Sequence, residues 1–305
     1  MYKNELKQIK ELTEGLSSLL EDTQSIIAGG AVTSIFTNSE INDIDVYFRS
    51  KEMFSAFLAG VLSRELDINY MTITHVSDRS ILMTDHNDLK VQLIYYKFFD
   101  SPEKIFEDFD FSVNMGAYDC KSGEFILHDS FMKHNAQRYI DINVNTAFPL
   151  ISVLRVDKYR KKGYEVSKAQ MLSLLLRITQ LELNGWDETI SACGGMYGID
   201  PKDLFDQTKE FSIGEVITQL QSLPKHLAMM KEGSGFKHHV IYEEEHYTKL
   251  ENSVVEDVMT KFKYHYNYFG ENTPVKDWDE IYDELIPEID IQNSEYRIDY
   301  KHFLM

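Results

Sequence analysis

Two aspartates separated by one residue are the side chains in this sequence best suited to chemistry. Asp43 and Asp45 occur in a run in which polar and apolar residues alternate, and this alternation predicts a β-strand. Residues at i and i+2 of a strand point to the same face, so both carboxylates are expected to project together. Adjacent carboxylates repel each other unless a cation binds between them, and Mg²⁺ prefers such oxygen ligands. The pattern therefore indicates a metal site, although a polar outer face of a sheet would show the same spacing.

A pair of glycines precedes the aspartates. Gly29 and Gly30 end a short apolar run, Ser25 to Ala28, that also reads as a strand. Glycine lets the backbone approach a ligand closely, and its amides can face a triphosphate. The order of strand, Gly-Gly and Asp-x-Asp strand indicates two-metal nucleotidyl transfer, in which one ion activates the attacking hydroxyl and the other steadies the leaving pyrophosphate. The expected cofactors are two Mg²⁺ ions, and the expected substrate is a nucleoside triphosphate (NTP).

These motifs resemble those of class II CCA-adding enzymes and bacterial poly(A) polymerases, within the polymerase β superfamily. That family carries a Gly-Gly-x-Val-Arg-Asp loop before Asp-x-Asp, and residues 29–34 have the same order here. Its Arg-Arg-Asp-Phe-Thr-Ile-Asn-Ala segment is similar to residues 109–119, and a hairpin with a glycine turn follows in both. The family's basic neck helix is similar to the stretch from Pro149 to Tyr164.

The resemblance implies roles for particular residues. Asp43 and Asp45 would be the catalytic metal ligands. The family's third carboxylate lies on the strand expected at 89–96, where Gln92 or Asp88 would complete the metal shell. Phosphate and nucleotide contacts would come from Gly29, Gly30, Ser34, Asp110, Asn114, Arg155 and Lys158. Tyr159 and Tyr164 are expected to stack beside the nucleotide.

The sequence also departs from the family pattern. Thr33-Ser34 replaces the Arg-Asp of the glycine loop, and Asp108-Phe109 replaces the paired arginines, so a guanidinium that could clamp the triphosphate is missing. Gln92 can offer a carbonyl oxygen to a metal but cannot neutralise its charge. These departures fit a divergent, phage-type enzyme, and they also fit a nucleotide-binding protein without catalysis.

The elements that must position these residues change in character near residue 145. Before it, short β-rich runs alternate with helices, and after it helical periodicity dominates. We expect strands at 25–28, 43–48, 70–75, 80–84 and 89–96, and helices at 3–20, 51–65, from 102 onward, 148–162, 168–183, 201–210, 213–231, 248–269 and 274–285. The fold class is therefore α+β. A polymerase β-like nucleotidyltransferase head, a mixed sheet with helices at residues 1–145, would precede an all-helical neck and body at residues 146–305.

The charge of the chain bears on its acceptor. The resemblance implies the 3′ end of tRNA or another RNA, but the net charge is −19, with 50 acidic and 31 basic residues. A protein that grips nucleic acid broadly needs a basic face, and the best candidate here is the short run from Arg155 to Lys162. An acidic surface of this kind keeps a protein soluble.

The remaining composition bounds the setting of the protein. No apolar run approaches the length needed to cross a bilayer, so we expect no membrane partner. The two cysteines, Cys120 and Cys193, form no CxxC pair, which favours a reduced, cytoplasmic setting.

Three functions from different classes remain open. The first is a nucleotidyltransferase that transfers a nucleoside monophosphate (NMP) from an NTP to RNA and releases pyrophosphate. The second is a nucleotidyltransferase that modifies a protein or a small molecule, as a toxin, an antitoxin or a defence factor would. The third is a catalytically inactive nucleotide-binding module.

Overall fold

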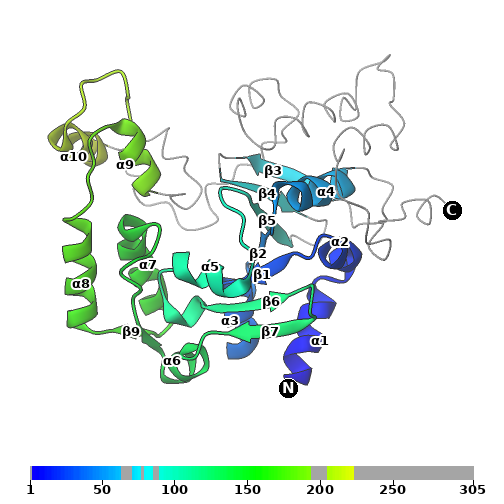
Figure 1. Ribbon diagram of the computed structural model, residues 1–305. Coiled ribbons are helices and arrows are strands. Elements are labelled where there is room, and N and C mark those ends of the chain that lie inside the picture. Colours follow the sequence, from blue (N-terminus) through cyan, green and yellow to red (C-terminus); the bar gives the residue numbers. More distant parts are fainter. Residues whose placement is uncertain (1, 63–70, 77–78, 85–88, 194–204, 223–305) are drawn as a thin grey trace, which may run out of the picture. The chain divides into compact units, whose positions relative to one another are not determined.

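A computed structural model describes residues 2–62, 71–76, 79–84, 89–193 and 205–222 of the chain. They form two compact units (Figure 1). The described part of the first unit lies within 2–105 and 116–127, and that of the second within 106–115 and 128–222. The division therefore differs from a simple boundary between residues 145 and 146, because residues 106–115 and 128–145 belong with the helices that follow them.

The first unit is built on a seven-stranded sheet with the strand order β3-β4-β5-β2-β1-β6-β7. Strands β2 and β5 pair in parallel, and every other neighbouring pair in this sheet is antiparallel. The strands are β1 (Ile26–Ala28), β2 (Asp43–Tyr47), β3 (Thr72–Val76), β4 (Ser80–Thr84), β5 (Lys90–Ile94), β6 (Gly116–Asp119) and β7 (Glu124–Leu127). A mixed sheet with helices, followed by a helical segment, confirms the α+β class.

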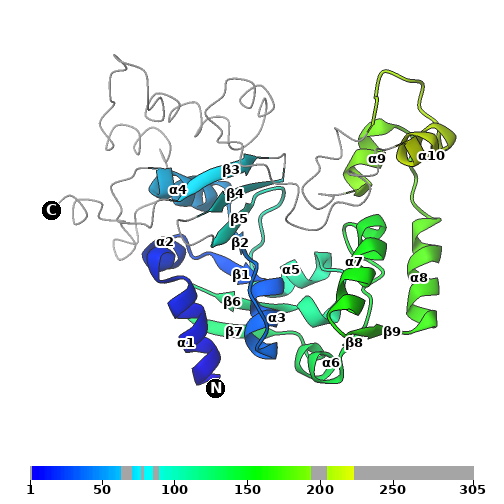
Figure 2. The same cartoon turned by 180° about the vertical axis from the view of Figure 1, so that it is seen from behind.

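Helices pack against this sheet and against one another. They are α1 (Lys3–Leu12), η1 (Glu14–Leu16), α2 (Ser17–Asp22), α3 (Gly30–Thr37) and α4 (Lys51–Leu62). A further helix, α5 (Pro102–Asp108), follows β5 in the chain. Helix α3 lies against β1, β2 and β6, and α1 packs on α3 (Figure 2).

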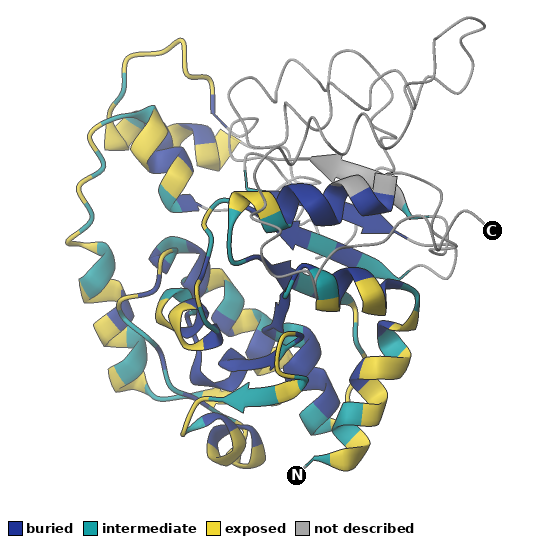
Figure 3. Cartoon of the chain, turned by 45° about the vertical axis from the view of Figure 1, so that its right-hand side comes forward, coloured by how far each residue is buried: buried dark blue, intermediate teal, exposed yellow. Residues whose placement is uncertain are grey.

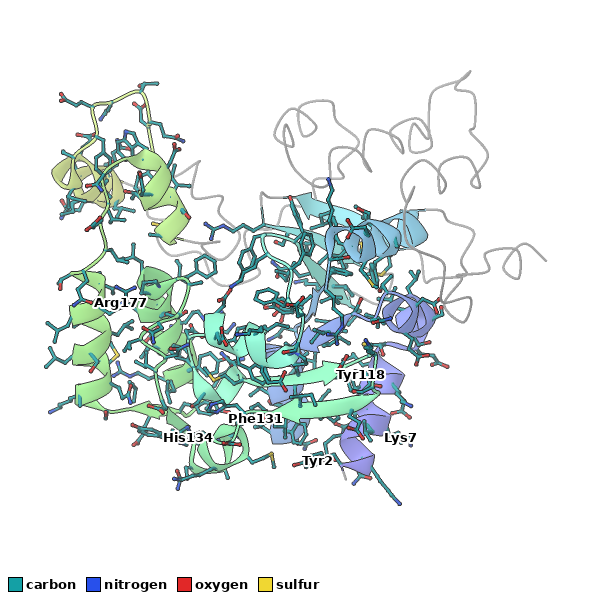
Figure 4. All side chains as sticks on the ribbon, viewed as in Figure 1. Tyr2, Lys7, Tyr118, Phe131, His134 and Arg177 are labelled. Carbon is teal, nitrogen blue, oxygen red and sulfur yellow. The ribbon has the colours of Figure 1, made fainter. Side chains whose placement is uncertain are left out.

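An aromatic cluster fixes the far end of α3 to the edge of the sheet. Phe36, at the end of α3, makes edge-to-face contacts with Tyr2 and Phe125, with ring centroids 5.0 and 5.1 Å apart. Tyr118 of β6 packs on Phe125 at 5.3 Å, and Figure 4 labels Tyr2 and Tyr118. Such edge-to-face pairs stabilise the fold beyond the effect of their buried area alone. They therefore hold α3 in one orientation.

The second unit consists of short elements around a core of its own (Figure 3). Its elements are η2 (Ser112–Asn114), α6 (Phe131–Gln137), β8 (Tyr139–Ile140), α7 (Pro149–Lys161), β9 (Glu165–Val166), α8 (Lys168–Ile178), α9 (Trp186–Cys193) and α10 (Ile213–Ser222). Residues from both sides of position 145 fill this core: Phe111, Val113, Ile140, Ile142, Val156, Tyr159, Tyr164 and Leu174.

The expected elements agree with the structure except at specific places. The strand at 80–84 is confirmed residue for residue, and the expected helix at 3–20 is interrupted after Leu12. The helix expected at 201–210 is wrong for residues 205–210, which form a bend and turns. There Asp206 accepts hydrogen bonds from the backbone and the hydroxyl of Thr208, and such local bonds compete with a helix. The helices expected at 248–269 and 274–285 lie outside the described residues.

Candidate functional site

The carboxylate pair lies on β2, in the interior of the sheet between β1 and β5. Asp43 and Asp45 are partly exposed, whereas Ile44 and Val46 between and after them are buried. The two aspartates therefore share the accessible face of the strand, and the apolar residues face the core. The strand and its common carboxylate face are those expected from the sequence.

A sharp turn connects β1 to α3 directly beside this pair. Ala28 is opposite Asp45 in the antiparallel pairing of β1 with β2, and Gly29 follows it. Gly29 has φ 86° and ψ −129°, a conformation that side chains with a Cβ rarely adopt, and it caps α3. Its N–H donates to the carbonyl of Gly116 at 3.0 Å, so this amide already has an acceptor.

The amides that follow Gly29 are better placed to bind an anion. The first N–H groups of a helix, here from Gly30 onward, have no acceptor within the helix. A Cβ added to Gly30 would meet no heavy atom within 4 Å among the described residues. The backbone at Gly30 therefore faces open space, and a phosphate could approach it closely.

The hydroxyl groups of α3 hold the turn together. Ser34 donates its hydroxyl proton to the carbonyl of Glu40 at 2.9 Å, and Thr33 donates to the carbonyl of Gly29 at 3.0 Å. The bond from Ser34 fastens the segment that leads into β2. A hydroxyl has one proton to donate, so the phosphate contact expected of Ser34 stays a prediction.

Strand β5 supplies the neighbours of the carboxylates. In the parallel pairing, Gln92 lies opposite Asp45 and Lys90 lies opposite Asp43. The Nε2 of Gln92 donates to the hydroxyl oxygen of Ser80 on β4 at 2.8 Å. Gln92 is therefore in the position expected for a third metal ligand, whereas the alternative, Asp88, lies outside the described residues. Sequence reasoning missed Lys90.

A second group of expected residues meets within the second unit. Asp110 is buried, and its Oδ2 lies 2.7 Å from Nε of Arg155 on α7. The N–H of that nitrogen is not directed at a good acceptor, so the contact is an ion pair and not an aligned hydrogen bond. The guanidinium also lies over the ring of Phe111, 6.0 Å from its centroid.

Asn114 is held by Tyr159 of the same unit. The Tyr159 hydroxyl donates to Oδ1 of Asn114, and burial raises the pKa of this tyrosine, so the hydroxyl stays protonated and a donor. The Nδ2 of Asn114 is buried and has no hydrogen-bond partner among the described residues. A buried amide of this kind is a donor suited to a ligand.

The remaining expected residues of the second unit differ in their exposure. Lys158 is partly exposed on α7, three residues after Arg155, so the two side chains share one side of the helix. Tyr159 and Tyr164 are 4% and 3% exposed, and both belong to the apolar core. The stacking role expected of these two tyrosines is therefore wrong, because their rings are covered by protein.

The described residues lack two further features. They contain no group of three or more His, Cys, Asp or Glu side chains that could hold a metal ion by themselves. They also contain no helix with the length and apolar character needed to cross a bilayer.

Comparisons of the sequence find similarity to a family and to a phage protein. Residues 2–138 match the family described as "Gabija anti-defense 2 family protein". The chain is 40% identical over 214 residues to "Gabija anti-defense 2" of Bacillus phage SPbetaL7, a stretch that covers 70% of this chain and 52% of the relative. The chain thus spans about half the length of the curated relative it matches.

Comparisons of the structure return CCA-adding enzymes. The complex of a CCA-adding enzyme with ATP is 12% identical, with a TM-score of 0.45 over 98% of this chain and 86% of that one. The Thermotoga maritima CCA-adding enzyme with tRNA has 12% identity and a TM-score of 0.42 over 96% and 83%. The Bacillus stearothermophilus CCA-adding enzyme with CTP has 13% identity and a TM-score of 0.39 over 59% and 47%.

Proposed function

We propose that this chain is a nucleotidyltransferase-like protein that counteracts a Gabija-type defence system. It would transfer NMP from an NTP to a hydroxyl group on a protein or small molecule of that system. One observation carries the chemical half of the proposal: Asp45 of the carboxylate pair lies opposite Ala28, the residue immediately before the Gly29-Gly30 turn. The name of the phage relative supports the biological half.

The residues of the first unit suggest how the reaction would run. The acceptor hydroxyl loses its proton to water, its oxygen forms a bond to the α-phosphorus, and the bond from the α-phosphorus to pyrophosphate breaks. The first amides of α3 bind phosphate oxygens, because free N–H groups and the helix dipole both favour an anion there. Asp43 and Asp45 would hold a divalent cation, which would supply positive charge that stabilises the transition state.

The residues of β2 and β5 limit how many divalent cations the site can hold. Asp43 and Asp45 suit one hard divalent cation, with phosphate oxygens completing its coordination, as is usual for Mg²⁺. The described residues add no third acidic ligand, and the residue opposite Asp45 is the neutral Gln92. These residues therefore do not fit the two Mg²⁺ ions expected from the sequence.

The nucleotide contact expected of Asn114, in the second unit, stays a prediction. The support is the buried Nδ2 of Asn114, which is a donor with no partner among the described residues. A donor buried without a partner costs roughly 1–3 kcal/mol, and a ligand acceptor would recover part of that cost. Asp110 lies four residues before Asn114 and forms an ion pair with Arg155 of α7. This ion pair would hold the segment from Asp110 to Asn114 in place.

The charge of the chain favours a protein or small-molecule acceptor over RNA. With a net charge of −19, long-range electrostatics repel a polyanion. The departures from the RNA-directed family, above all the missing paired arginines, act in the same direction.

Two linked assays test the proposal. In cells that carry a Gabija system, the wild-type chain and an Asp43→Asn/Asp45→Asn variant are compared for rescue of phage growth. In vitro, each is incubated with Mg²⁺, α-labelled NTPs, purified Gabija proteins and total cellular RNA. The substitution to asparagine keeps the size of the side chains and removes their charge. Melting curves check that both proteins are folded.

The outcomes separate the three functions. Rescue by the wild type alone, with label on a Gabija protein or a small molecule, supports the proposal. Label on RNA would instead favour an RNA-directed enzyme. Rescue that survives in the asparagine variant, with no label on any acceptor, would favour an inactive binding module.

A further inference from the structure

The accessible face of β2 and β5 carries a cation as well as two carboxylates. Both strands show the same alternation: Asp43, Asp45, Lys90 and Gln92 are partly exposed, and the residues between them are buried. Residues opposite each other on paired strands project from the same face of a sheet. Lys90 therefore lies beside Asp43 on the face that would bind the nucleotide.

The charge of this face does not suit two metal ions. Two carboxylates and one ammonium group have a net charge of −1. Two divalent ions, which lie about 4 Å apart in two-metal sites, together bring a charge of +4. Lys90 would repel a second ion placed near Asp43. A third carboxylate would offset this repulsion, but the position next to Asp45 holds a neutral amide.

Gln92 is fastened as part of the fold. Its Nε2 donates to the hydroxyl oxygen of Ser80 at 2.8 Å, and Ser80 is 7% exposed. The amide is thus tied to a buried partner on β4, and the site keeps its low charge. An amide oxygen can complete the coordination of one cation, but it adds nothing to the neutralisation of a second.

Lys90 itself forms no ion pair with any described residue, Asp43 included. An ammonium group without a carboxylate partner, on a partly exposed face beside a phosphate-binding turn, is suited to a phosphate oxygen. Half of the charge that a second divalent ion would bring is therefore available from the chain.

We infer that Lys90 takes the place of one of the two metal ions, so that its ammonium group binds the nucleotide phosphates while Asp43 and Asp45 hold a single divalent cation. This inference rests on the proposed function, because it concerns the same nucleotide site. Lys90 and Gln92 together would then determine that the protein binds one metal ion per nucleotide.

The test counts metal ions and does not depend on turnover. The full chain is dialysed to equilibrium against Mn²⁺ and a non-hydrolysable NTP analogue, and the bound Mn²⁺ and bound nucleotide are both measured. A Lys90→Met variant removes the charge and keeps most of the apolar stem. A Lys90→Met/Gln92→Asp variant restores the acidic character of a two-metal site. Lys10→Met, on the exposed side of α1, is the matched control.

We expect one Mn²⁺ per bound nucleotide for the wild type and the control, and two for the double variant. We expect Lys90→Met alone to weaken nucleotide binding about tenfold, as the loss of one charge-assisted bond does. Two ions per nucleotide in the wild type, or unchanged affinity in a folded Lys90→Met protein, overturn the inference and leave the proposed function standing. If the wild type retains no nucleotide at any Mn²⁺ concentration, both are overturned.

Discussion

Gly30 lies at the first position of α3 with open space in front of its Cα. A methyl group at this position should be accommodated without a clash, because no described heavy atom lies within 4 Å of it. Gly30→Ala should therefore leave thermal stability unchanged or raise it by up to about 1 kcal/mol. It should nevertheless weaken binding of a fluorescent NTP at least about tenfold, because the methyl group occupies the space for the phosphate.

Gly29→Ala is the matched control for that substitution. Gly29 has φ 86°, and a residue with a Cβ is strained there by roughly 1–3 kcal/mol. This variant should melt earlier than the wild type. If Gly30→Ala binds NTP as tightly as the wild type, the phosphate does not approach at the start of α3.

Cys120 gives the protein a dependence on alkaline pH. Burial, with a smaller effect of Asp119, raises the pKa of this thiol from 9.0 to about 12. Between these values the unfolded chain has released the proton and the folded chain retains it. Stability should therefore fall as pH rises from 9 toward 12. Urea denaturation at pH 8, 9.5 and 10.5 should show a smaller decline for Cys120→Ala, and equal declines would contradict this pKa.

Individual site residues differed in how far the sequence could predict them. Asp43 and Asp45 were predictable, because i and i+2 geometry is local to one strand. Lys90 was not, because its place beside Asp43 depends on the pairing of strands that are far apart in the chain. Tyr159 was misjudged for a similar reason: its position on α7 is local, but its burial is decided by packing against Phe111.

Among the elements, β2 is held at its C-terminal end by the contacts of one arginine, which we call the Arg49 clamp. The guanidinium of Arg49, two residues after β2, contacts three segments. Its Nε donates to the carbonyl of Gln24 at 3.0 Å, and another nitrogen donates to the carbonyl of Asp100. The third nitrogen lies 2.7 Å from Oδ1 of Asp119, and both side chains of this ion pair are largely buried. The clamp joins the end of β2 to the start of β1 and the end of β6.

Removing this clamp should loosen the strand that carries the carboxylates. Arg49→Met should lower the free energy of unfolding, measured by urea denaturation, by about 3 kcal/mol, because it leaves the largely buried negative charge of Asp119 without its cation. Asp119→Leu in the same chain should recover part of that loss, since no carboxylate then remains unpaired. Losses that simply add in the double variant would show that the ion pair contributes little.

The elements themselves were predictable to different degrees. Strand β4 is a short, mostly apolar run and helix α7 begins at Pro149, and both were expected nearly at their observed bounds. Helix α3 was not expected, because a glycine pair reads as a turn, and the helix forms through the cap at Gly29 and packing on β1 and β2. Strands β8 and β9 are two residues long, too short for any periodic signal.

At the scale of the whole molecule, the two units alternate along the chain. A fragment that ends at residue 145 would keep Phe111, Val113, Ile140 and Ile142 but lose Val156, Tyr159, Tyr164 and Leu174, which pack on them. We expect this fragment to expose apolar surface, bind the dye ANS and lack a cooperative thermal transition, unlike the full chain. A fragment 1–145 that melts cooperatively without binding ANS would show that the second core does not need its helices.

The same alternation governs the order in which the protein can fold as it is made. Strand β1 pairs with β6, yet residues 28 and 116 are separated by the carboxylate strand, the β3–β5 hairpins and an excursion into the other unit. At common rates of synthesis, about 90 intervening residues take roughly 5–20 s to emerge from the ribosome. During that interval one edge of the strand next to the glycine turn remains unpaired. A nascent chain is therefore exposed to aggregation until the β6–β7 hairpin arrives.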